Sequence, residues 1–96
     1  MTDYQEARNF FDAFIGRTWN YPTDVRMGVT GTAHEEWAFA NENSEPSRLK
    51  KEFASGLNAS ADLLEKEGGY AGKKTAQAIR EILEELTPNY LDNNAD

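Results

Sequence analysis

The chain has 96 residues, enough for one small folded domain and too few for two separate cores. Its 17 acidic and 10 basic residues give a formal net charge of −7, which disfavours direct nucleic-acid binding through clustered positive charge. The absence of cysteine excludes a disulfide framework, a zinc–thiolate site and a cysteine nucleophile. No apolar run is long enough to cross a bilayer, and acids lie near the start, where a signal peptide has bases. We therefore expect a cytoplasmic protein with no membrane contact.

Helical spacing of apolar side chains predicts a first helix over residues 3–15. Three of these side chains are phenylalanines, which makes this helix the expected anchor of the core. Gly16 offers a left-handed stop at its end. The repeating positions are Tyr4, Ala7, Phe11 and Phe14, with Phe10 and Ile15 beside them.

Residues 17–31 have the least regular pattern. Pro22 restricts Tyr21 to extended backbone, and the next apolar residues, Val25, Met27 and Val29, alternate with other residues. Alternation is typical of a strand, but no partner strand is visible in the chain. Strand, loop and helix stay open for residues 25–29, and an irregular loop between the first two helices is the favoured interpretation.

Three further helices are predicted downstream. The capping-box spacing of Thr32 and Glu35 predicts that the second helix begins at residue 32 and runs to about residue 42. Pro46 suits the first turn of a third helix, which ends before the glycine pair at 68–69. A linker over residues 68–72 leads to a fourth helix over about 73–86, which Pro88 ends.

The predicted fold class is all-α, a compact bundle of about four helices. Residues 1–88 form the expected single domain, and residues 89–96 are expected to be a flexible, frayed acidic tail. A core this small is marginal for a monomer, so we expect a homo-oligomer that associates through a helix face.

A first candidate site is acidic. Glu35 and Glu36 are adjacent carboxylates at the predicted start of the second helix, a place where the helix dipole favours acids whatever the function. Facing acids from the third helix would allow them to hold a divalent cation.

The order of these elements resembles the MazG-like all-α nucleoside triphosphate pyrophosphatases. A phenylalanine-rich helix, a proline-containing loop and paired glutamates follow one another, and the resemblance covers about residues 4–66. It implies a magnesium-dependent pyrophosphohydrolase with Glu35, Glu36, Glu52 and Asp62 as metal ligands. The family's third acid is replaced here by Phe39, and its aspartate by Ser55.

A second candidate site combines aromatic and arginine side chains. Residues 1–46 hold only three bases against eight acids, and all three bases are arginines. Aromatic faces stack on nucleobases, and guanidinium groups bind phosphates. The alternative is that the aromatics cover the core and the arginines pair with nearby aspartates. The predicted ligand-binding residues are Arg8, Arg17, Trp19, Tyr21 and Arg26.

The predicted function is therefore a small, acidic, non-catalytic binding or inhibitor protein that needs no cofactor. Its expected ligand is a host protein or a phosphorylated nucleotide. The size and composition resemble those of phage and mobile-element proteins that block host defence. The magnesium-dependent pyrophosphohydrolase is one alternative. An assembly or immunity protein that docks through exposed aromatics, namely Trp37, Phe39 or the Tyr21 loop, is the other.

Overall fold

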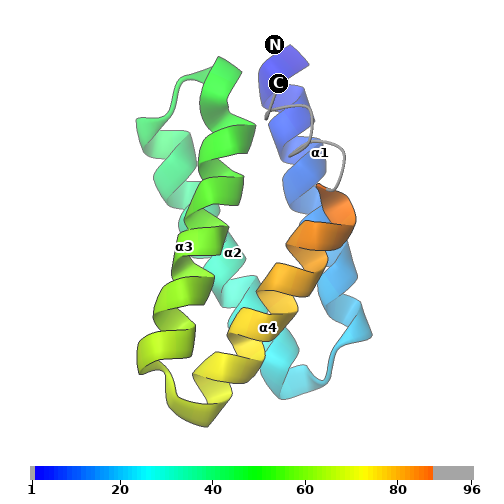
Figure 1. The fold of residues 1–96 in the computed structure, drawn as a ribbon. Coiled ribbons are helices and arrows are strands. Elements are labelled where there is room, and N and C mark those ends of the chain that lie inside the picture. Colours follow the sequence, from blue (N-terminus) through cyan, green and yellow to red (C-terminus); the bar gives the residue numbers. More distant parts are fainter. Residues whose placement is uncertain (1, 88–96) are drawn as a thin grey trace.

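The computed structural model describes residues 2–87, and this part of the chain contains helices and no strand (Figure 1). Two short 3-10 helices lie between the longer ones, η1 between α1 and α2 and η2 between α2 and α3. The all-α fold class is confirmed, while the predicted tail over residues 89–96 lies outside the described residues. In chain order the elements are α1 (Thr2–Arg17), η1 (Thr18–Asn20), α2 (Thr23–Asn43), η2 (Pro46–Arg48), α3 (Leu49–Glu67) and α4 (Gly69–Leu86).

Helix α1 continues past Gly16, which was expected to end it. A glycine ends a helix when it takes a left-handed conformation, and among the described glycines only Gly69 has a positive φ. The chain instead passes directly from the α-helix, which ends at Arg17, into the 3-10 helix η1. The buried Thr18 fastens this transition, because its Oγ1 donates a hydrogen bond of 2.6 Å to the carbonyl oxygen of Ile15.

Helix α2 begins at Thr23, so the predicted start at residue 32 is wrong, and residues 23–31 form helix where a loop was favoured. The irregular segment between the first two helices is limited to residues 18–22. Val25, Val29 and Ala33 follow one another every four positions and are all buried, which a continuous helix achieves and a strand does not. The Thr32 hydroxyl does not cap a helix. It donates instead to the carbonyl oxygen of Gly28 within α2, at 2.9 Å.

Helices α3 and α4 lie side by side and are joined by a single residue, Gly68 (Figure 1). Gly69 has a φ of +67°, a conformation that suits glycine and reverses the chain at once. The predicted linker over residues 68–72 is therefore mostly helix, and α4 begins four residues earlier than expected. Gly72 is buried against the carbonyl oxygen of Leu64, which leaves no room for a larger side chain there.

One apolar cluster receives side chains from all four helices. The predicted role of α1 is confirmed, because Phe14 is fully buried and Phe10 packs edge-on against Phe53 of α3 at 5.8 Å between ring centres. Trp37 of α2 meets the same Phe53 ring at 5.5 Å, again edge-on. Within residues 2–87, no helix combines the length and apolarity that crossing a membrane requires.

Candidate functional site

An exposed aromatic–cation pair lies where α1 passes into α2. Trp19 of η1 is 68 % exposed, an unusual position for so large an apolar ring. The guanidinium carbon of Arg26 lies 3.4 Å from the centre of the indole ring. Helical side chains lean toward the helix N-terminus, so Arg26, in the first turns of α2, reaches back to the residue in η1. We call this pair, with its flanking residues 17–21, the corner.

Arg26 differs from every other arginine of the chain in its charge environment. The other four each have a carboxylate oxygen within 4.0 Å, and among the described residues Arg26 has none. Its Nε is also buried without a hydrogen-bond partner in the described part of the protein. An unpaired guanidinium is unexpected where 17 acids are available. The paired arginines are Arg8, Arg17, Arg48 and Arg80.

The backbone adds positive potential at the corner. Pro22 occupies the N-cap position of α2, and no side chain caps this end of the helix. The first N–H groups of a helix lack intrahelical acceptors and carry the positive end of its dipole. Asp24 is the acid of the first turn, yet it forms no ion pair with Arg26. Arg26 thus lies beside the uncapped start of α2 and has no carboxylate partner among residues 2–87.

Two contacts tie the corner to α4. The Tyr21 hydroxyl donates a hydrogen bond of 2.8 Å to Oε1 of Glu81, and Nε of Arg17 lies 3.1 Å from Oε2 of Glu85. Burial, the hydrogen bond to Glu81 and the negative charges of both glutamates raise the pKa of Tyr21 to about 12. Sequence reasoning did not connect these glutamates with the corner, because no local pattern marks a contact between residues 60 positions apart.

Four of the five predicted ligand-binding residues therefore gather at the corner, and Arg8 does not. Arg8 precedes Arg17 by nine positions on α1, about 13 Å along the helix axis. Its Nε lies 3.3 Å from Oδ1 of Asp12, and its guanidinium lies over the Phe11 ring at 5.6 Å. The expected pairing of Arg8 with an aspartate is present.

The four predicted metal ligands are not assembled. Glu35 and Glu36 lie in the middle of α2, so the explanation that they occupy a first helical turn is wrong. Oε2 of Glu36 accepts a 2.7 Å hydrogen bond from Ser60. Among residues 2–87, no group of three or more His, Asp or Glu side chains is placed to hold a metal ion. The remaining two carboxylates face arginines, Glu52 at 3.6 Å from Arg48 and Asp62 at 2.6 Å from Arg80.

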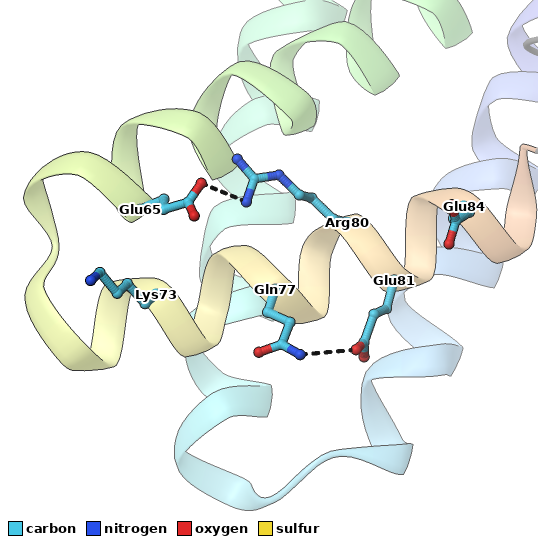
Figure 2. A pocket seen from close by; sticks show the side chains of 6 residues that line it. All are labelled: Glu65, Lys73, Gln77, Arg80, Glu81 and Glu84. Carbon is cyan, nitrogen blue, oxygen red and sulfur yellow. Dashed lines mark hydrogen bonds and ion pairs between the residues drawn. The ribbon is translucent and has the colours of Figure 1, made fainter.

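A second surface feature is an open groove of about 440 Å³ along α3 and α4 (Figure 2). Figure 2 shows Glu65 reaching from α3 toward Arg80 of α4, which it meets at 2.8 Å. Arg80 also binds Asp62, so its charge is already satisfied within the protein, and both contacts raise its pKa. The groove is lined by Glu65, Lys73, Gln77, Arg80, Glu81 and Glu84.

The aromatics proposed for docking separate into two kinds. Trp37 is buried in the core and is not available to a partner. Phe39, two residues later on α2, is exposed, as are Trp19 of the corner and Tyr70 at the start of α4.

The chain matches no protein-family model, no curated protein and no solved structure. Its function is therefore inferred from its own side chains. The corner combines an exposed indole with a guanidinium that has no carboxylate oxygen within 4.0 Å among residues 2–87.

Proposed function

We propose that the protein is a small cytoplasmic binding protein that holds a phosphorylated nucleotide at the corner without transforming it. The observation that carries this proposal is the stack of an unpaired guanidinium on an exposed indole. The open surface of Trp19 suits a nucleobase, and base–aromatic stacking is worth about 1–3 kcal/mol per base. The two terminal nitrogens of Arg26 suit phosphate oxygens, which guanidinium groups bind in a fork.

The chemistry of Arg26 favours an anionic ligand over an apolar one. The N–H donors of a guanidinium lie in its own plane, so a ring stacked on one face does not occupy them and they can still bind an anion at the edge. Its buried Nε lacks an acceptor, so the protein itself does not satisfy this side chain. An acidic segment of a host protein is the second occupant that this chemistry admits, and the experiment below separates the two.

The test is to mix the purified protein with a panel of mono-, di-, tri- and cyclic nucleotides, with and without magnesium. The protein is then separated from free ligand, denatured by heat and extracted, and both fractions are read by mass spectrometry. We expect one nucleotide class to be recovered intact from the protein fraction, and to be lost in Arg26→Gln. Arg48→Gln is the matched control, because it removes the same charge from an exposed arginine outside the corner.

The same samples test the alternatives. A monophosphate product that forms only with magnesium would overturn the binding proposal and support the pyrophosphohydrolase with Glu35, Glu36, Glu52 and Asp62 as magnesium ligands. If no nucleotide is retained or changed, an affinity capture with Arg26→Gln as control shows whether a protein occupies the corner. Retention of a cyclic nucleotide would support the proposed role in blocking a host defence response, because removal of a signalling nucleotide is one way to stop such a response.

A further inference from the structure

The segment that carries Trp19 is fastened on its inner side by a buried threonine. Thr18 is 1 % exposed, and the Thr30 hydroxyl of α2 lies 3.4 Å from its Oγ1. The next residue, Trp19, turns outward to solvent. This inner contact fixes where the segment sits on the bundle, but it leaves the outer side of the segment to other contacts.

On the outer side, the two ends of the segment are held by α4. Arg17 and Tyr21 lie two positions before and two positions after Trp19, and each contacts one glutamate of α4. Glu81 and Glu85 are four residues apart, so they lie one turn apart on the same side of that helix. We call these two contacts, Tyr21 with Glu81 and Arg17 with Glu85, the tethers. Trp19 is midway in sequence between them, and they end on consecutive turns of α4.

Glu81 is itself held in place by its own helix. Nε2 of Gln77 donates a hydrogen bond of 3.3 Å to Oε2 of Glu81 (Figure 2). The Tyr21 hydroxyl donates to the other oxygen, Oε1. Both carboxylate oxygens of Glu81 therefore accept a hydrogen bond, and these two bonds fix the orientation of the carboxylate that holds Tyr21. A neighbouring carboxylate on α4, Glu84, has no ion pair or hydrogen bond with residues 17–21.

From this arrangement we infer that Glu81 and Glu85 are positioning residues: through Tyr21 and Arg17 they hold Trp19 under Arg26 before the ligand arrives. This inference rests on the proposed function, because it assigns the tethers a role in binding at the corner. A site that is already ordered loses less freedom on binding, so the tethers increase affinity without touching the ligand. Their charge has the opposite effect, since carboxylates near a phosphate site repel the ligand.

Loss of a tether should weaken ligand binding, whereas loss of a negative charge alone should strengthen it, so the two effects can be told apart. Tyr21→Phe removes one tether with no change of charge, and Glu85→Ala removes the other. We expect each to weaken binding of the retained nucleotide about two- to fivefold, and the double variant about tenfold. Glu84→Ala is the matched control on the same helix, and a purely electrostatic effect predicts that it tightens binding as much as Glu85→Ala does.

A second measurement needs no ligand. Because the guanidinium carbon of Arg26 lies 3.4 Å from the centre of the Trp19 ring, we expect the ring current to shift the Arg26 Nε–H resonance upfield in the free protein. Loss of this shift in Trp19→Ala would assign it to the indole. Loss of much of the shift in the two tether variants, with Glu84→Ala unchanged, supports positioning. Recovery in the charge-exchanged double variant, Arg17→Glu with Glu85→Arg, supports it further.

The two measurements separate the possible failures. If the tether variants keep both the resonance and the wild-type affinity, the positioning role is overturned and the proposed function stands. If the wild-type protein retains no nucleotide, the proposed function fails, and the Arg26 resonance still decides whether α4 orders the corner. Circular dichroism of each variant shows that the helical fold is intact.

Discussion

Gly28 of α2 lies directly against the side chain of Thr75 of α4. A Cβ at position 28 would fall 2.8 Å from the Thr75 Oγ1, closer than real side chains approach. Thr75 is buried and, being β-branched, has little rotamer freedom with which to withdraw. The close contact of α2 with α4 therefore depends on the missing side chain.

This contact predicts opposite effects of alanine at two glycines of the same helix. Gly31→Ala meets nothing within 4 Å and should raise the free energy of unfolding by about 0.5–1 kcal/mol, because alanine favours the helix. Gly28→Ala gains the same preference but overpacks against Thr75, and we expect a net loss of about 1–2 kcal/mol. Urea unfolding of both variants measures the two effects. A destabilised Gly31→Ala would contradict a continuous α2.

Substitution of Trp37 should lower stability, whereas substitution of Trp19 should lower nucleotide binding. Trp37→Ala removes a buried ring from the aromatic cluster and should cost about 3–5 kcal/mol of unfolding free energy. Trp19→Ala should cost less than about 1 kcal/mol, because it removes an exposed ring and one cation–π contact. Nucleotide retention should be lost in the stable Trp19 variant. Thermal melts followed by the retention assay test both parts, and a Trp19→Ala protein that retains nucleotide as well as wild type contradicts the site.

The ionisation of Tyr21 supplies a pH-dependent prediction. Its pKa is raised from 10.0 to about 12, so the folded state favours the protonated phenol. The stabilisation is complete below pH 10 and is lost as the pH rises through about 12. Part of the tyrosinate absorbance at high pH should therefore appear late, near pH 12, and Tyr21→Phe should lack this part. Tyr70→Phe serves as the control, and a late part that survives in Tyr21→Phe would show that another tyrosine causes it.

Self-association is a prediction from chain length and exposure. A chain of 96 residues buries a small core, and several large apolar side chains remain on the surface of the described part. We expect sedimentation equilibrium to give a mass at least twice that of one chain at micromolar concentration. A monomer mass across the whole concentration range would refute homo-oligomerisation. The exposed side chains are Tyr4, Trp19, Met27, Phe39, Leu63 and Tyr70.

Where one long apolar stripe dominates, the sequence was sufficient to predict the fold. The stripe from Leu49 through Phe53 and Leu57 to Ala61 is unbroken and fully apolar, and it predicts α3 closely. In α2 the same spacing is present at Val25, Val29 and Ala33. It was obscured there by Met27, whose side chain faces solvent and completes a false alternation.

The remaining errors come from contacts that only the folded chain makes. A hydroxyl three positions before a glutamate predicts a helix start, but the Thr32 hydroxyl bonds back along α2 instead. The candidate site was predictable as a set of residue types around Trp19, and four of the five residues do converge. Their anchors, Glu81 and Glu85, were not predictable, because they belong to a helix at the other end of the sequence.

The central claim is that Arg26 and Trp19 together bind a phosphorylated nucleotide. The most direct test is an NMR titration of the ¹⁵N-labelled protein with ATP, cyclic AMP and inorganic phosphate, following the Arg26 Nε–H and Trp19 indole N–H resonances. We predict that both resonances move together and saturate with a nucleotide. Phosphate should move mainly the Arg26 signal. In Arg26→Gln, none of the three ligands should move the Trp19 indole signal. Two results would contradict the claim: both resonances stay still at millimolar nucleotide, or the Trp19 indole resonance moves as much in Arg26→Gln as in the wild type.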